Sequence, residues 1–474
     1  MPVGLWTDYF ILLLVTAVIA YAVHVRRQPH LLAPWRRVVQ SAPGMSALVV
    51  FWLFVTVGLL DSMHYRPALE RKADQNVAYS TEVLSVLDWI ASPLRDHRER
   101  TYSAPFATRA FARETLEVTT AEGRVQQLRE FPKLIWGGTH LTSEADRSGD
   151  ILARTLLGLA LATIAWGAIA GTVAAGLARK IKRPVGQTWR AIWRNETGTP
   201  WRAILITIGV LLLLAGPALM LCAYYHVLGT DKVGRDVLYL ALKSIRTGLV
   251  IGTLTTLVVL PFAVTLGIMA GYFRGVIDDL IQYFYTTINS IPTVLLIVAC
   301  VLMAQVLIDL HPELAPTAAQ RADLRLLVLC TVLGLTGWIG LARLLRGESL
   351  KVRELEYIQA AQAFGVRQAG IIYRHILPNV MHIVLISLVM DFSSLVLAEA
   401  VLSYIGVGVD PSMISFGTMI NAARLEMSRE PVVWWILLAA FVFMFALVLA
   451  ANLFADAVRD AFDPRVKVGG LASA

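Results

Sequence analysis

Two carboxylates lie within one apolar stretch of the sequence, Asp391 near its middle and Glu399 closer to its end. A charged side chain inside a membrane-spanning helix costs free energy, so such residues are candidates for a functional site. Asp391 is placed to pair with a polar group of another helix. Glu399 has either a function of its own or the structural task of accepting hydrogen bonds from the bent segment that follows. Proton transfer is the chemistry that these two acids permit.

Signatures of catalysis are missing from the sequence. It contains no G-x-x-x-x-G-K-[ST] loop, which cradles the phosphates of ATP, no H-E-x-x-H zinc site and no G-x-S-x-G nucleophile turn. Its three cysteines, Cys222, Cys300 and Cys330, lie in apolar runs and offer neither a disulfide framework nor a thiolate metal site. We therefore expect no catalytic residue, metal site or cofactor in this chain, and any use of ATP requires a partner.

Hydropathy places the chain in a membrane. Of its 474 residues, 57% are hydrophobic and 16% are charged, whereas about a quarter of a soluble domain is charged. The backbone must satisfy its own hydrogen bonds in lipid, so apolar stretches of about 20 residues are predicted to be helices. Nine spans are predicted, at 5–25, 46–62, 151–178, 203–224, 244–272, 287–309, 325–345, 380–405 and 433–455.

Basic residues predict the orientation of these spans. No Lys or Arg precedes the first span, whereas Arg26, Arg27, Arg36 and Arg37 follow it. By the positive-inside rule the N-terminus then lies outside and, after nine crossings, the C-terminus lies in the cytoplasm. Further basic clusters at 179–194, 346–374 and 459–467 fall on the inside, so anionic lipid explains the net charge of +8 better than nucleic acid does. The long outside segment 63–150 is predicted to be a small subdomain or a partly ordered spacer.

An inside loop, residues 346–379, has the pattern of a docking helix. Tyr357, Ala360, Ala361 and Phe364 recur at i, i+3, i+4 and i+7 and form one apolar stripe, which Gly365 is able to end. A second helical run, 367–377, is predicted to stop at Pro378. Small alanines on the stripe permit close approach by another protein, and the alternative is an amphipathic helix on the lipid surface.

This loop resembles the coupling loop of ABC importer permeases. The pattern of that family is E-A-A, three residues, G, about nine residues and then an apolar residue near L-P. It stands here as Gln359-Ala360-Ala361, Gly365 and Leu377-Pro378. Gln359 replaces the glutamate of the family and so removes the carboxylate of an ion pair to the ATPase. The steric features of the two alanines and the glycine remain.

Three more motifs resemble the dipeptide and oligopeptide class of these permeases, in the order that the class has them. Residues 398–408 resemble A-E-A-x-L-S-F-L-G-x-G, and residues 456–465 resemble L-R-D-x-L-D-P-R. The signature L-G-T-D-x-x-G-R-D is matched at 228–238 by Gly229, Thr230, Asp231, Gly234, Arg235 and Asp236. This segment either forms part of a periplasmic gate or contacts a binding protein or partner permease, or it is structural only, with a helix cap at Thr230 or Asp231.

The resemblance implies an all-α, polytopic transmembrane helix bundle: a type I ABC importer permease core of six helices, of the C-type, with about three extra N-terminal helices. It implies alternating access in a bacterial inner membrane. The implied partners are a second permease subunit in a heterodimer, two ATP-binding subunits that hold ATP and Mg, and a periplasmic or extracellular substrate-binding protein. Peptides or peptide-like solutes are the implied substrates.

Four parts of the chain are predicted: an N-terminal extension at 1–178 with its periplasmic segment at 63–150, a linker at 179–202, the permease core at 203–467, and the coupling loop at 346–379 within that core. Residues 137–154 are similar to 229–242, and each copy is followed by a span. We therefore expect either a partial duplication of the first two core helices or an insertion that moved the original outside loop away from the working copy. The motif G-x-x-x-G at Gly267 and Gly271 predicts close helix packing.

Two other classes of function stay open from the residues alone. The chain is a secondary transporter if Asp391 and Glu399 carry protons, or a membrane scaffold that transports nothing. Uptake by proteoliposomes with and without ATPase partners separates these alternatives from the permease of an ATP-driven importer.

Overall fold

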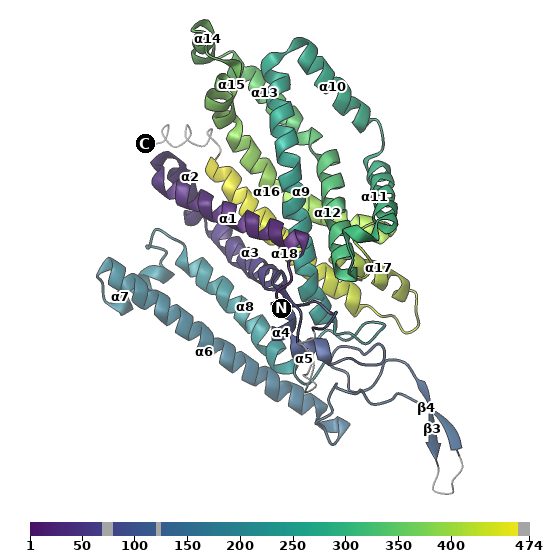
Figure 1. Cartoon of the computed structure of the whole chain (residues 1–474). Coiled ribbons are helices and arrows are strands. Elements are labelled where there is room, and N and C mark those ends of the chain that lie inside the picture. The colour runs from purple at the N-terminus through teal and green to yellow at the C-terminus, as the bar shows by residue number, and fades with distance from the viewer. Residues whose placement is uncertain (69–78, 120–124, 463–474) are drawn as a thin grey trace, which may run out of the picture. The chain divides into compact units, whose positions relative to one another are not determined.

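The computed structural model describes residues 1–68, 79–119 and 125–462, which are mostly helical (Figure 1). Nine helical stretches of these residues are long and apolar enough to cross a membrane, at Trp6–Arg27, Ala42–Asp61, Glu144–Ile181, Trp201–Leu221, Val237–Phe273, Thr293–Leu310, Ala318–Arg353, Gln368–Ile405 and Trp435–Phe462. Each predicted span has its counterpart, so the all-α transmembrane fold is confirmed. The end of the predicted C-terminal motif, 463–465, lies outside the described residues.

Several helices extend beyond the predicted spans, and α9 (Val237–Phe273) shows why. Hydropathy alone predicts a start at residue 244, because Lys243 is charged. In the structure the Nζ of Lys243 lies 2.7 Å from the carboxylate of Asp61 and 3.0 Å from that of Asp88. Because these two carboxylates compensate the charge of Lys243, the helix includes this residue and begins directly after Asp236, which caps its N-terminus.

The chain forms two compact units, each made of separate segments. The first unit consists of 1–3, 39–246 and 414–450. Its elements are α3 (Ala42–Asp61), β1 (His64–Tyr65), β2 (Leu84–Ser85), α4 (Val86–Ile90), α5 (Ser92–Asp96), β3 (Glu114–Thr119), β4 (Val125–Glu130), η1 (Glu144–Asp146), α6 (Arg147–Ile181), α7 (Val185–Trp193), α8 (Trp201–Leu221), α17 (Phe416–Glu426) and the N-terminal parts of α9 and α18 (Trp435–Phe462). The predicted division into extension, linker and core rests on which segments resemble the permease family in sequence. These two units do not test it, so it stays a prediction.

Small residues bring α6 and α8 together in the first unit. The residues that α6 buries are Gly158, Ala162, Ala170, Ala174 and Ala178, which follow one face of the helix. A Cβ atom on Gly158 would lie 2.7 Å from the carbonyl oxygen of Gly216, so the two backbones are nearly in contact. Close approach of small residues is the usual basis of helix pairing in lipid.

Among its described residues, the segment between α3 and α6 contains two antiparallel strand pairs and two short helices. Strand β1 pairs with β2, and β3 pairs with β4 in a hairpin that extends from the rest of the segment (Figure 1). Tyr102 and Leu94 of this segment join Val237 and Trp435 in one buried apolar cluster. The described residues of this segment therefore form a folded subdomain, and its location outside the membrane stays a prediction.

The predicted duplication is matched in helix order but only partly in turn geometry. A long helix, an intervening segment and a second long helix occur twice, as α3 and α6 and again as α8 and α9. Gly138 and Gly229 both have positive φ, +69° and +70°. Gly149, however, lies within α6, whereas Gly234 has a φ of +73° ahead of α9. The duplication stays a prediction.

The second unit consists of 4–38, 247–413 and 451–474, as far as these residues are described. Its elements are α1 (Trp6–Arg27), most of α2 (Pro29–Gln40), α10 (Gly275–Asn289), α11 (Thr293–Leu310), η2 (Pro312–Leu314), α12 (Ala318–Gly337), α13 (Ile339–Arg353), α14 (Glu356–Ala363), α15 (Gln368–Ile371), a π-helical turn η3 (Ile372–Ile376), α16 (Leu377–Ile405) and the remaining parts of α9 and α18.

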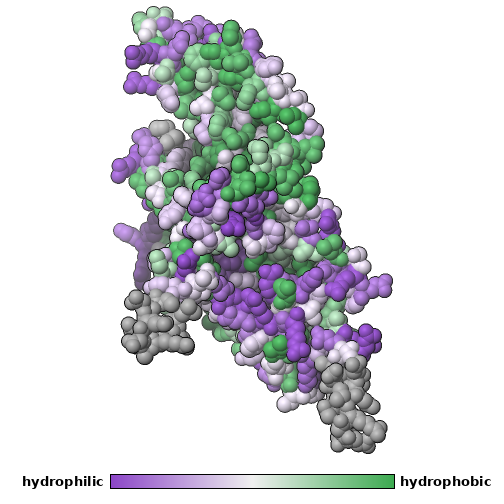
Figure 2. Space-filling view, turned by 45° about the vertical axis from the view of Figure 1, so that its right-hand side comes forward, coloured by the Kyte–Doolittle hydropathy of each residue, from purple (hydrophilic) through white to green (hydrophobic). Residues whose placement is uncertain are grey.

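Helix α1 packs on α12 within the second unit, where the backbone N–H of Thr7 donates to the carboxylate of Asp323 at 3.1 Å. Helix α9 approaches α13 through Gly267 and Gly271, which confirms the predicted close packing: a Cβ on Gly271 would lie 2.6 Å from the carbonyl oxygen of Arg346. Figure 2 shows a broad green hydrophobic surface in the upper part of the view. Exposed apolar side chains of this kind, such as Val276 and Leu280 of α10, suit contact with lipid or with another membrane subunit.

Candidate functional site

The 346–379 loop folds as a short helical arm. It runs from the end of α13 through α14 and α15 into η3 and α16. Helix α14 ends where the glycine pattern predicts: Gly365 has a φ of +73°, and the N–H of Val366 donates to the carbonyl of Ala361 at 3.1 Å. This is the Schellman arrangement, for which a glycine at positive φ costs least.

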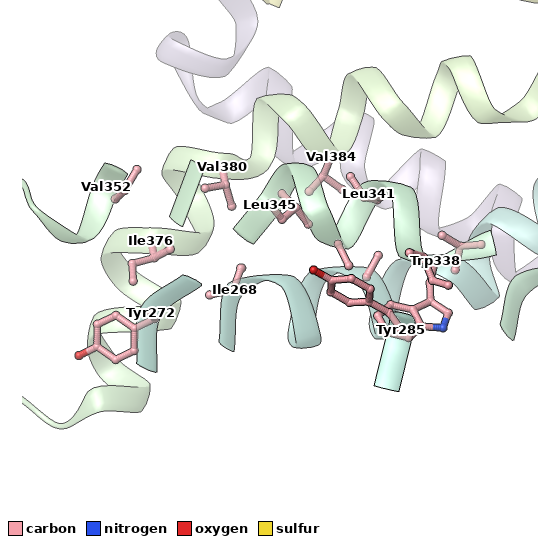
Figure 3. Close-up of a cluster of buried hydrophobic side chains, with 14 of the residues drawn as sticks. Ile268, Tyr272, Tyr285, Trp338, Leu341, Leu345, Val352, Ile376, Val380 and Val384 are labelled. Carbon is pink, nitrogen blue, oxygen red and sulfur yellow. The ribbon is translucent and has the colours of Figure 1, made fainter. Parts of the chain in front are cut away.

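Three isoleucines anchor the loop. Ile358, Ile371 and Ile376 are fully buried and join a cluster that includes Tyr272 of α9 and Val380 of α16. Figure 3 shows Ile376, Val352 and Tyr272 close together at one end of this cluster. Burying one such side chain stabilises the fold by about 1.5–3 kcal/mol. The loop is therefore held firmly against the ends of three long helices.

Polar contacts reinforce this anchoring. Arg346 binds the carboxylate of Asp278 in α10 through Nε at 2.6 Å and Nη2 at 2.7 Å. Hydrogen bonding from Arg346 lowers the pKa of Asp278 and outweighs burial, which acts in the opposite direction. Arg353 donates to the carbonyl of Tyr272 at 2.7 Å. The two hydrogen bonds from Arg346 to Asp278 fix the orientation of these side chains as well as their distance.

The predicted stripe of α14 faces outward. Tyr357 is 44% exposed and Phe364 is 87% exposed, Ala360 is exposed, and Ala361 is half-buried. Gln359 is exposed and donates from its own side chain to the carbonyl of Glu354 at 3.2 Å. An exposed phenylalanine at the end of this helix suits contact either with another protein or with the lipid surface, so both predicted alternatives stay open.

Pro378 does not stop the second helical run, and that prediction is wrong. The run continues through η3 into α16, with Leu377 and Pro378 in the first turn of α16. Proline is tolerated in a first turn, because its missing N–H has no partner to lose there. The wider π turn before it changes the spacing of the carbonyls, and Asn379 donates from its side-chain amide to the carbonyl of His375 at 2.7 Å. The same amide donates to the hydroxyl of Tyr357 at 2.9 Å and so links α14 to α16.

The second predicted site, residues 229–236, is largely buried by the folded subdomain. Thr230 is fully buried, and its hydroxyl donates to the carbonyl of Thr101 at 2.9 Å. A Cβ on Gly234 would lie 1.8 Å from the carbonyl oxygen of Glu99, so only glycine fits there. Asp231 accepts from the backbone N–H of Arg235 at 2.8 Å, and Arg235 keeps 39% of its side chain exposed.

Asp236, rather than Thr230 or Asp231, caps a helix. Its carboxylate accepts from the N–H of Leu238 at 2.8 Å and of Tyr239 at 3.3 Å, at the start of α9. The same carboxylate lies 2.8 Å from Nδ1 of the buried His226. Glu99 of the subdomain lies 3.4 Å from Nε2 of that imidazole and also accepts from the N–H of Ile135 at 2.7 Å.

This buried triad, His226 with Asp236 and Glu99, holds a charge. Burial opposes a charged imidazole, but the hydrogen bonds and charges of Asp236 and Glu99 outweigh it and raise the pKa of His226 to about 9. Burial also opposes the charged form of Glu99 and so raises its pKa. The hydrogen bonds from His226 and from three backbone N–H groups outweigh this effect and lower the pKa below the ordinary value. The sequence reasoning missed the triad, since the partners are far apart along the chain.

The two intramembrane acids lie in different surroundings on α16. Glu399 is 1% exposed and accepts from the hydroxyl of Ser403 at 2.7 Å. Asp391 is half-buried, and its carbonyl rather than its carboxylate accepts from Ser394 at 2.8 Å. Proton transport by either acid stays a prediction.

Comparison with known proteins gives three related results. The family described as binding-protein-dependent transport system inner membrane component matches residues 263–468. The oligopeptide transport system permease protein OppC of Mycobacterium tuberculosis is 30% identical over 239 residues, which are 50% of this chain and 76% of that protein. The glutathione transport system permease protein GsiD of Pectobacterium atrosepticum is 31% identical over 242 residues, 51% of this chain and 73% of that protein. The dipeptide transport system permease protein DppC of Bacillus subtilis is 27% identical over 242 residues, 51% of this chain and 69% of that protein.

Proposed function

Because this chain belongs to the family of binding-protein-dependent transport permeases of peptide ABC importers, we propose that it forms half of a translocation pathway coupled to ATPases through the 346–379 loop. Two separate subunits hold ATP and Mg and supply the energy. A substrate-binding protein delivers the solute on the opposite face of the inner membrane. A second, different permease subunit completes the pathway.

One observation carries this proposal: α14 presents an apolar stripe on a helix that cannot move independently. Phe364 and Tyr357 are exposed, while Ile358 on the same helix is fully buried. A partner that grips the exposed side therefore pulls on the buried side too. Close packing transmits such displacements, because a packed core moves as a body rather than deforming continuously.

The buried contacts carry the displacement into long helices. Arg353 holds the loop to the end of α9, and Asn379 ties Tyr357 to the start of α16. Both α9 and α16 are long enough to cross the membrane. Closure of the two ATPases accordingly changes the tilt of these helices, which is the step that alternating access requires.

The test is co-purification of the ATPase subunits with the full transporter carrying Ala360→Arg. We expect loss of bound ATPase, because a long charged side chain stands on the stripe where close approach is needed. Ala363→Arg is the matched control: Ala363 is exposed and lies on the same helix, to one side of the stripe. It should retain the ATPase. If both variants retain the ATPase equally, the assignment of the 346–379 loop as the coupling loop is wrong.

The predicted orientation fits this proposal. With the N-terminus outside and the C-terminus in the cytoplasm, the basic residues around 346–379 lie on the side of the ATPases. The 229–236 segment then lies on the side of the binding protein. We propose that its buried residues shape the surface met by that protein, and that the partly exposed Arg235 touches it directly.

Peptides or peptide-like solutes are the proposed substrates. The relatives are named for oligopeptide, glutathione and dipeptide transport, which share the peptide bond. Specificity within that class is expected to reside in the binding protein.

A further inference from the structure

The connection between α6 and α8 carries a set of basic side chains that the proposed function does not use. Helix α7 lies at the joined ends of these two helices (Figure 1). Residues 179–202 contain one acid, Glu196. The basic residues, all of them exposed, are Arg179, Lys180, Lys182, Arg183, Arg190, Arg194 and Arg202.

These basic side chains form no ion pair with the residues that the structure describes. The basic residues of α13 behave differently, since Arg346 binds Asp278 at 2.6 Å and Lys351 binds Glu348 at 3.0 Å. Seven exposed cations in a short segment repel one another, so the segment is electrostatically incomplete without an anionic partner.

The packing of α7 places these charges near the membrane surface. Its buried residues are Thr188, Ala191 and Ile192, and Ile192 packs with Ala170 and Ala174 of α6 and with Leu205 of α8. Ala174 lies inside the apolar stretch of α6, about 10 Å from the end of that helix at 1.5 Å per residue. Helix α7 therefore folds back along the ends of two spans instead of extending away from them.

The aromatic residues of this connection also indicate that α7 lies near the membrane surface. Trp189 and Trp193 of α7 contact each other edge to face, with ring centroids 5.9 Å apart, and Trp201 starts α8. Tryptophan is enriched at the level of the lipid headgroups, where Arg and Lys also reach the phosphates.

We propose that residues 179–202 form a binding surface for the phosphate groups of anionic phospholipids. The exposed arginines of α7 and of the end of α6 neutralise these phosphates, while Ile192 and the tryptophans hold α7 at the required depth. The surface thus fixes the ends of α6 and α8 to anionic lipid.

Lipid titration of the purified full chain in non-ionic detergent tests this. Dioleoylphosphatidylglycerol should raise the thermal unfolding temperature, and dioleoylphosphatidylcholine should not. In R190Q/R194Q the concentration of phosphatidylglycerol needed for half the effect should rise about 30-fold, from the contribution of two cations near an anionic surface. R190K/R194K should keep the response, because it keeps both charges.

The matched control is R98Q/K232Q, which removes two exposed cations far from this segment in the sequence and should respond as the unaltered chain does. An equal response of R190Q/R194Q and the control contradicts the proposal, and so does a response to phosphatidylcholine. If inorganic phosphate alone reproduces the shift, the surface binds free anions and the lipid assignment is wrong. Loss of the response in R190K/R194K also overturns the charge argument.

Discussion

Single residues decide how the folded subdomain is held on the 226–236 segment. His226 lies between Asp236 at 2.8 Å and Glu99 at 3.4 Å, and all three are buried. A buried carboxylate is costly unless a cation and hydrogen bonds compensate it, so the imidazolium stabilises two carboxylates at once. The contact joins residues 127 positions apart, between the subdomain and the loop that leads into α9.

Stability of this contact is expected to fall at alkaline pH. The folded-state pKa of His226, about 9, is above its ordinary value of 6.5, so its contribution is complete below pH 6.5 and is lost as the pH rises through 9. The shift corresponds to roughly 3 kcal/mol. Hydrogen exchange, corrected for intrinsic rates, should show loss of protection at the N–H groups of Ile135 and Trp136, which donate to Glu99.

His226→Gln provides the comparison, because it cannot carry the charge. Its protection at the same two N–H groups should be lower at pH 6.5 and should change little up to pH 9.5. An unaltered chain whose protection stays constant across that range would contradict the assigned charge state of His226.

The sequence predicted the residues of this site only in part. The signature at 229–236 placed a helix cap at Thr230 or Asp231, whereas Asp236 caps α9. Glu99 and His226 were missed because neither lies in a motif and their pairing depends on tertiary folding. Ile358 was missed for the same reason, since its burial depends on distant side chains such as Tyr272.

Among the helices, the contact between α9 and α13 is the one that positions the 346–379 loop. The two glycines of the G-x-x-x-G motif let the α9 backbone approach α13 at Ala342 and Arg346. Arg346 in turn binds Asp278 of α10. Three helices therefore meet where the loop begins, at Arg346.

Gly271→Ala is expected to strain this contact. The added Cβ would lie 2.6 Å from the backbone carbonyl oxygen of Arg346. Because this neighbour is backbone, it cannot rotate away as a flexible side chain would. The free energy of unfolding should therefore fall by about 1–3 kcal/mol. Gly347→Ala in α13 is the control, because nothing lies within 4 Å of its added Cβ. The control should be neutral or gain up to about 1 kcal/mol from helix propensity.

Denaturation of the purified chain measures both variants. Equal stability of the two would show that α9 and α13 are not in close contact at Gly271. Hydropathy and the small-residue motif were enough to predict two membrane spans here and close packing at Gly267 and Gly271, but not that α13 is the helix packed against them. They did not predict where α9 begins. Hydropathy counts Lys243 as an uncompensated charge, whereas in the folded structure it pairs with Asp61 and Asp88.

At the scale of the whole molecule, the chain combines a region that matches the permease family with a long additional region. The family match covers 263–468, and α1, α3 and α6 precede it. The subdomain between α3 and α6 buries the signature segment at Thr230 and Gly234. We therefore expect a binding protein to meet this subdomain as well as the loops of the core.

We propose that ATP hydrolysis drives peptide uptake through this chain by way of the 346–379 loop. The most direct measurement is uptake of a labelled oligopeptide by proteoliposomes that contain both permeases and both ATPases, with the binding protein added outside. Uptake should require ATP and the binding protein, fall to background with Ala360→Arg, and persist with Ala363→Arg. Uptake driven by a proton gradient without ATP, or unchanged by Ala360→Arg, would contradict the account.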